Sequence, residues 1–190
     1  MTSSRFEEIV SLLDKTERNL KRIERIDDSF VCFALNEWRY ATRHAITYMQ
    51  NGTAAEEIKV IGHLKRAYFD SCDILIDGLL GEIASYESLF KGYSGIVSAI
   101  VPDFRESYVK VWEAKEKHFD AQTYSLEARE AKYDSLEPYC VALEAFADNL
   151  EKSRNAWQDD ILVQKRRDRM PVLWTAIGIA VSIILAVVFA

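Results

Sequence analysis

Residues Pro171 to Ala190 read PVLWTAIGIAVSIILAVVFA, a run that contains no charged side chain. An apolar stretch of about 20 residues is the length that a helix needs to cross a hydrocarbon core of about 30 Å. A helix also satisfies its own backbone hydrogen bonds in lipid. The sequence therefore predicts a single-pass transmembrane helix at 171–190, at the C-terminal end of the chain, that acts as a tail anchor.

A basic segment, residues 165–170, comes directly before this run. Its four cations are Lys165, Arg166, Arg167 and Arg169, and we call this segment the collar. Cationic flanks of a membrane span stay on the cytoplasmic side. The collar therefore predicts that residues 1–164 form a cytoplasmic domain, on the inner membrane if the protein is bacterial. The first twenty residues carry charges throughout, which is unlike a secretory signal peptide.

The rest of the composition fits a domain in a reducing compartment. The three cysteines Cys32, Cys72 and Cys140 are widely spaced and form no CxxC pair, so we expect buried thiols. The histidines do not join them at the spacing of zinc ligands, and no motif indicates another metal or a cofactor. The formal charge of −6 argues against broad nucleic-acid binding.

Helical periodicity dominates the first 164 residues and predicts an all-α fold. We expect an antiparallel bundle of about five helices, because apolar residues recur every three or four positions between short polar breaks. Asn51-Gly52 should end the second helix, and Thr53 with Glu56 has the spacing of a capping box for the third. The expected helices span residues 4–26, 30–50, 53–90, 103–134 and 138 onward, with 96–102 as a buried connector or a membrane-dipping segment.

Two apolar patterns describe the last two of these helices. Trp112, Phe119, Leu126 and Tyr133 recur every seventh residue, a narrow stripe that predicts a more exposed helix. From Cys140 to Ile161 apolar residues alternate at spacings of three and four, which predicts a coiled-coil seam leading to the collar. Arg154 falls inside that seam. It either fixes the partner number of an oligomer or extends its cation out to solvent.

The predicted span also carries a stripe of small residues. Gly178, Ser182, Ala186 and Ala190 are four positions apart, which lets a second helix pack closely. We therefore expect a homo-oligomer held partly by its anchor. The alternative is that the stripe reflects only the high Ala and Gly content of apolar spans.

The second helix contains Arg39-Tyr40-Ala41-Thr42-Arg43-His44, an arginine and a histidine separated by four residues. Here the chain resembles the HEPN family of helical bundles, some of which are membrane-bound accessory proteins of bacterial antiviral systems. HEPN proteins are often dimeric and cut RNA with an R-x4-6-H motif. The resemblance implies a catalytic pair of Arg39 and His44, although the residue after the family's arginine is usually polar and is Tyr40 here.

The chemistry implied by this pair is coherent. A histidine can move the proton of a ribose 2′-hydroxyl, and an arginine can stabilise charge on a phosphate. On a continuous helix His44 is rotated by about 140° from Arg39, so the two would meet only across a dimer or at a helix break. The alternative is that Arg39 and Arg43 form a solvated face and that His44 lies beside Glu37.

The third helix has a second polar stripe, which consists of His63, Arg66 and Asp70. Arg66 and Asp70 have the spacing of a helical ion pair. Together with Arg39, Arg43 and His44 this stripe could form a site or a subunit contact. The alternative is an ordinary solvated face.

Taken together, these features predict a tail-anchored, homo-oligomeric helical protein. We expect it to act as a non-enzymatic membrane effector or scaffold that perturbs the membrane or forms a pore, and the HEPN resemblance implies a role in antiviral defence. The first alternative is a membrane-tethered HEPN-type ribonuclease that binds RNA. The second is a SNARE-like tether, since that class also joins heptads to a tail anchor. Membrane lipid and a protein are the other expected partners.

Overall fold

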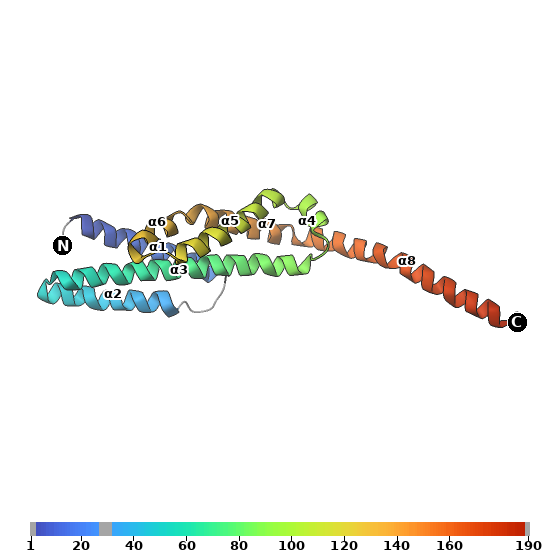
Figure 1. Cartoon of the computed structure of the whole chain (residues 1–190), viewed down its shortest axis with the longest axis horizontal. Coiled ribbons are helices and arrows are strands. Elements are labelled where there is room, and N and C mark those ends of the chain that lie inside the picture. Colours follow the sequence, from blue (N-terminus) through green and yellow to red (C-terminus); the bar gives the residue numbers. More distant parts are fainter. Residues whose placement is uncertain (1–2, 27–31, 189–190) are drawn as a thin grey trace.

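The computed structural model describes the backbone of residues 3–26 and 32–188 (Figure 1). The side chains at positions 3, 32, 126, 127, 172, 173 and 176, and from 181 to 188, lie outside the described part. Every regular element of the described residues is a helix, and only turns, bends and short irregular links lie between them, so the all-α prediction is confirmed. The helices are α1 (Ser3–Ile26), α2 (Cys32–Asn51), α3 (Ala54–Leu89), α4 (Ser94–Ile100), α5 (Phe104–Gln122), α6 (Leu126–Asp134), α7 (Glu137–Lys152) and α8 (Arg154–Val188).

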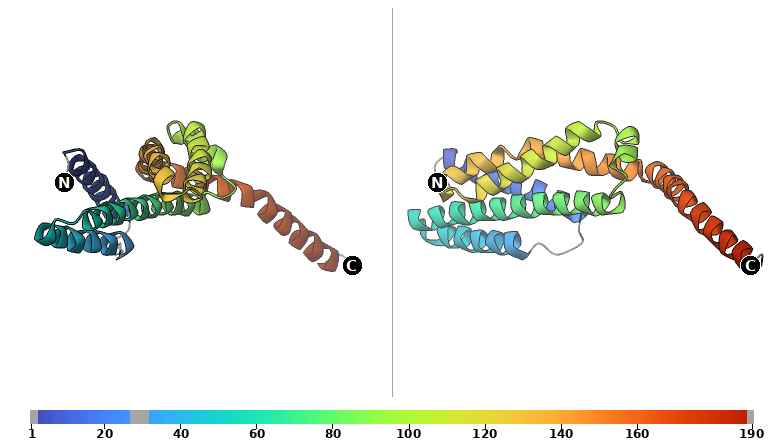
Figure 2. Two further views of the ribbon diagram at one scale, coloured as in Figure 1. Left: turned by 60° about the vertical axis from the view of Figure 1, so that its left-hand side comes forward. Right: turned by 45° about the vertical axis from the view of Figure 1, so that its right-hand side comes forward.

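The 36-residue helix α3 runs along the middle of the bundle. α1 and α7 pack against it on one side together with α5 and α6, and α2 folds back against it on the other (Figure 1). The buried residues Leu64, Leu75, Leu79 and Ile83 of α3 form the centre of the apolar core. α3 therefore separates a thick multi-helix layer from the single helix α2, and Figure 2 shows the same division from two further directions.

The turn between α2 and α3 lies where the sequence predicts it. Gly52 has a φ of +66°, which a residue without Cβ adopts readily, and Thr53 is the N-cap residue of α3. The predicted capping box is wrong, because the Thr53 side chain makes no cap hydrogen bond. The Glu56 carboxylate bonds to His44 and Lys59 instead of reaching back to the start of the helix.

The fourth predicted helix is two helices, α5 and α6. α5 ends at Gln122, and the Arg129 guanidinium donates to the carbonyl oxygens of Gln122 and Tyr124, which the helix no longer satisfies. The break turns Tyr133 into the core, where it is 1% exposed. Trp112 and Phe119 of α5 point outward at 64% and 72% exposure, because smaller residues of α5 face the bundle.

The fifth predicted helix is also divided, at Ser153, into α7 and α8. The seam residues Leu143, Leu150 and Trp157 are fully buried in the core of the chain's own bundle, and the coiled coil predicted from their spacing stays a prediction. The Trp157 indole donates to the carbonyl of Leu150 and joins the two helices across the break. Arg154 is the first residue of α8. Its side chain is 43% exposed and pairs with Glu151, so its cation extends toward solvent, the second of the two predicted alternatives.

The short apolar run near residue 100 is the connector helix α4. Val97 and Val101 are buried and anchor it on the bundle. Two of the cysteines, Cys72 and Cys140, are buried and unpaired as predicted, and burial raises the pKa of the Cys140 thiol to about 12. Cys32 lies outside the described side chains.

α8 leaves the bundle after its first three turns and projects alone (Figure 1). Ile161 is the last buried residue among its described side chains, and every described side chain from Arg166 to Ala180 is exposed. Within the described residues, no helix combines the length and the apolar character that crossing a membrane requires. The second half of the predicted span, from Val181 onward, lies outside the described side chains.

Candidate functional site

Two histidines of neighbouring helices stack between α2 and α3. The His44 and His63 rings are nearly parallel, with centroids 5.2 Å apart and an angle of 10° between their planes. The Tyr40 ring lies 5.5 Å from that of His63 on the outer side. We call the two histidines with Glu37, Glu56 and Arg66 the histidine cluster.

Each histidine contacts a carboxylate through Nδ1. His44 pairs with Glu56, and His63 lies 2.7 Å from Glu37. Burial raises the pKa of Glu37, but hydrogen bonds from His63 and Arg66 outweigh it and leave the pKa below its usual value. Hydrogen bonds from Lys59 and then from His44 likewise lower the pKa of Glu56. Both carboxylates are therefore held in the charged form.

Arg66 contacts both His63 and the carboxylate that His63 binds. Its Nη2 lies 2.9 Å from His63 Nδ1, while its Nε donates to Glu37 over 2.9 Å. An arginine can only donate, so the contact with Nδ1 is a hydrogen bond only when that nitrogen carries no proton. When Nδ1 is protonated, it donates to Glu37 instead. The proton on this ring therefore switches its partner between an arginine and a glutamate.

The structure brings together part of the predicted polar stripe. His44, His63 and Arg66 meet in the cluster, whereas Arg39 and Arg43 lie exposed on the outer face of α2. The Arg39 guanidinium lies over the Tyr40 ring. Because α2 is continuous from Cys32 to Asn51, Arg39 and His44 do not face one another within a chain.

The ion pairs of the cluster differ from those expected from the sequence. Arg66 donates to Glu37 and not to Asp70, and burial followed by repulsion from Glu37 raises the pKa of Asp70. His44 pairs with Glu56 rather than with Glu37. The sequence interpretation gives Glu56 a capping role and places Glu37 beside His44 rather than beside His63. The Glu37–His63 pair links two helices and has no signature within either one.

A second histidine centre, not predicted, lies inside the multi-helix layer. His118 of α5 is 6% exposed, and its Nε2 lies 2.7 Å from an Asp73 oxygen that also accepts from the Tyr133 hydroxyl. The same oxygen therefore ties α5 and α6 to α3. This arrangement fixes helix positions, and its burial keeps a substrate from reaching the imidazole.

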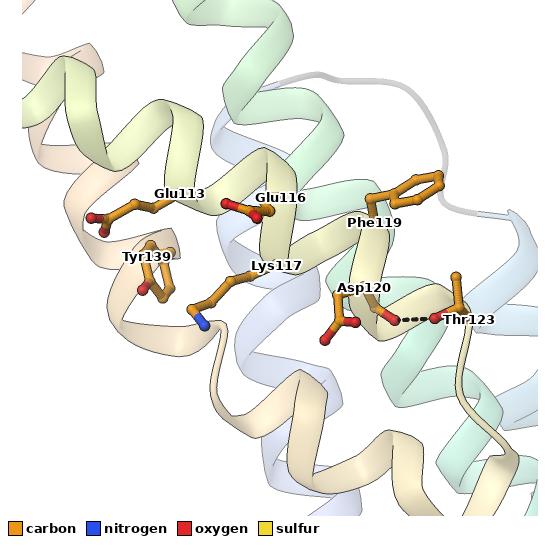
Figure 3. Close-up of a pocket in the computed structure, with 7 residues that line it drawn as sticks. All are labelled: Glu113, Glu116, Lys117, Phe119, Asp120, Thr123 and Tyr139. Carbon is orange, nitrogen blue, oxygen red and sulfur yellow. Dashed lines mark hydrogen bonds between the residues drawn. The ribbon is translucent and has the colours of Figure 1, made fainter.

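A surface pocket of about 540 Å³ lies beside α5 (Figure 3). Acidic side chains dominate it, with one ammonium group and one tyrosine, and two of the acids are neutralised from outside by Lys110 and Lys132. Its lining residues are Glu113, Glu116, Lys117, Phe119, Asp120, Thr123 and Tyr139. Across the described ranges, no group of His, Cys, Asp or Glu side chains has the geometry to hold a metal ion.

The predicted membrane and oligomer residues lie on α8. The Lys165 ammonium lies over the Tyr93 ring, and Arg166, Arg167 and Arg169 are exposed. A Cβ placed on Gly178 would meet no atom within 4 Å, so that position is open to a neighbouring helix. Ser182 and Ala186 lie outside the described side chains.

Comparisons with known proteins identify no relative from which a function could be inferred. No protein-family model matches the chain, and neither the curated proteins nor the solved structures contain a match. The HEPN resemblance and its implied catalytic pair therefore stay predictions.

Proposed function

We propose that this protein is a tail-anchored helical membrane protein that acts as a non-enzymatic effector or scaffold. The observation that carries the proposal is the uncharged run from Pro171, preceded by the four cations of the collar. Among the described side chains of α8, the bundle contacts those as far as Lys165. The support for the part of the span beyond Ala180 is the sequence alone.

The exposed half of α8 supports this assignment. Trp174, Ile177 and Ile179 are 63%, 43% and 57% exposed, and they follow one another on the part of α8 that no other described helix covers (Figure 1). Contiguous large apolar groups in water mark a surface that contacts a partner or a membrane. Trp174 lies one turn after Pro171, where an aromatic ring suits the membrane interface.

The proposed oligomer rests on the small residues of the span. Gly178 has open space around its Cβ position, and Ser182 and Ala186 continue the same helical stripe in the sequence. Two such helices can approach closely in lipid. Copies anchored side by side would form the scaffold, and the antiviral role implied by the HEPN resemblance stays a prediction.

Membrane fractionation of the full-length protein tests the proposal. We expect the full chain to sediment with membranes and to resist alkaline carbonate extraction. A variant that ends at Met170 keeps the collar and the whole bundle, and it should stay in the supernatant. Full extraction of the complete chain by carbonate would contradict the tail anchor.

A second candidate function, a membrane-tethered ribonuclease, is favoured by the stacked pair of His44 and His63. Each ring is oriented by a carboxylate at Nδ1, the arrangement that prepares an imidazole for acid–base work. Arg39 would join His44 only from a second copy. RNA cleavage by the full-length protein in detergent, lost in His44→Ala and kept in the exposed variant Thr42→Ala, would support this function, and no cleavage by the wild type would exclude it.

A further inference from the structure

The turn between α3 and α4 is held beside α8 at the point where α8 leaves the bundle. Phe90, at the end of α3, packs edge-on against Trp157 of α8 with ring centroids 5.9 Å apart. Three residues later, the Tyr93 ring lies 5.5 Å from the Lys165 ammonium. Two contacts therefore fix the turn against α8, one inside the core and one at the edge of the collar.

The position of this turn relative to the proposed span follows from helix geometry. Lys165 precedes Pro171 by six residues, which is about 9 Å of helix at a rise of about 1.5 Å per residue. Helical side chains lean toward the N-terminus, so the Tyr93 ring lies up to about 6 Å further from the span. The turn therefore lies within about 15 Å of the hydrocarbon core.

That distance is within the range of the headgroup charges. The polar layer on each side of a bilayer is roughly 5–8 Å thick, and charges beyond it are felt over a Debye length of about 8 Å at physiological ionic strength. A cation on the turn, with its own flexible side chain, would therefore reach anionic headgroups.

The turn carries the chemistry for such a contact. Lys91 is exposed and forms no ion pair with the described residues, and the neighbouring Leu89 is 46% exposed. The only acid among residues 165–170 is Asp168, which accepts a hydrogen bond from Gln164. This end of an otherwise acidic chain, with a net charge of −6, is thus locally cationic.

We propose that the α3–α4 turn is a second lipid-binding surface, through which Lys91 and the collar together bind anionic headgroups. The inference rests on the proposed tail anchor and adds an orientation to it. The bundle stands with α4 against the leaflet, and the tip of the α2–α3 hairpin points away. Because α3 has 36 residues, that tip is about 54 Å from the turn along the helix.

A depth-sensitive label on the full-length protein tests this orientation. An environment-sensitive fluorophore is attached through Ser94→Cys at the start of α4, directly after the turn, or through Gln50→Cys near the hairpin tip. Both positions are exposed, and the variants are made in a Cys32→Ser background. The remaining thiols, Cys72 and Cys140, are buried. The protein is reconstituted in phosphatidylcholine vesicles with or without phosphatidylserine, and quenching by headgroup spin-labelled lipid is measured.

We expect the label at Ser94→Cys to be quenched, more strongly with phosphatidylserine, and the label at Gln50→Cys to remain unquenched. Lys91→Gln should lower the ratio of docked to undocked bundle roughly fivefold in phosphatidylserine vesicles, the effect of one cation near such a surface. The matched variant Lys117→Gln, an exposed lysine on α5, should leave it unchanged.

The outcomes separate this inference from the proposed function. Equal quenching at the two positions, in protein that resists carbonate extraction, would overturn the docked orientation and leave the anchor in place. Protein that is extracted by carbonate would overturn the anchor and, with it, this inference. If Lys91→Gln does not change the quenching of the label at Ser94→Cys, the proposed role of the headgroup charge is overturned.

Discussion

The two halves of α8 belong to one helix but have different surroundings. In the first half, Trp157 is fully buried and Ile161 is 3% exposed, both packed into the bundle. In the second half, Trp174 and Ile177 are 63% and 43% exposed. Residues of the same kind therefore stabilise the fold in one half and leave a large apolar surface in the other. The apolar residues of the second half therefore do not stabilise the bundle, and we infer that they contact a different environment.

The largest expected effect is the loss of Trp157. Trp157→Ala removes a buried indole, its hydrogen bond to Leu150 and its contact with Phe90, and we expect it to lower the free energy of unfolding by about 3–5 kcal/mol. Urea unfolding of the detergent-solubilised protein measures this. Trp174→Ala is the matched control in the other half of the helix and should change it by less than about 0.5 kcal/mol.

Equal effects of these two tryptophan variants on the free energy of unfolding would contradict the difference between the two halves of α8. A large decrease of this free energy in Trp174→Ala would mean that the second half of α8 also packs on the bundle. A small loss in Trp157→Ala would mean that the junction of α7 and α8 contributes little to the fold.

A smaller effect is expected from enlarging the small-residue stripe. Gly178→Leu with Ser182→Leu should lower the amount of crosslinked dimer in native membranes roughly fivefold or more, because leucine side chains at these positions keep two helices from packing closely. Ala180→Leu lies on another face of the helix and serves as the control. Unchanged crosslinking in the double variant would remove the anchor from the oligomer interface.

α2 provides an intermediate case between the two halves of α8, because it packs on α3 and is also tied to it by ion pairs. Hydrogen bonds from His63 and Arg66 overcome the effect of burial and lower the pKa of Glu37 below its ordinary value of 4.5. This carboxylate therefore stabilises the fold above pH 4.5, and the contribution is lost as the pH falls through the lower folded pKa. Glu37→Gln should flatten the acid limb of a stability–pH curve.

The change is expected to be the smallest of the three, because Glu37 is partly exposed. Thermal melting of the protein from pH 3 to pH 7 would measure this change in stability, with Glu116→Gln, an exposed glutamate on α5, as the control. An acid limb that is equally steep in wild type and Glu37→Gln would show that other groups control the acid sensitivity.

The sequence was sufficient to predict the helices but not all of their breaks. Periodicity and the Asn51-Gly52 turn located α1 to α3 correctly, because local signals specify helix ends. The break between α5 and α6 depends on Arg129 satisfying carbonyls several residues earlier, and the one at Ser153 is bridged by Trp157. Such contacts form only after folding and have no periodic signature.

The candidate site was predicted in part for the same reason. His44, His63 and Arg66 could be selected because each lies on a polar face, but which carboxylate each would bind depends on how α2 lies on α3. His118 and Asp73 are 45 residues apart and meet only in the folded bundle. On α5, periodicity identified an aromatic stripe without showing that smaller residues, such as Ala114 and Ala121, would face the core.

Hydrogen–deuterium exchange along α8, with and without lipid vesicles, tests the central claim most directly. Amides from Arg154 to Lys165 should be protected in both conditions, because the bundle covers them. Amides from Val172 onward should exchange quickly in detergent-free buffer and become strongly protected in vesicles, as the proposed span requires. Exchange beyond Pro171 that is equally fast with and without vesicles would contradict the account.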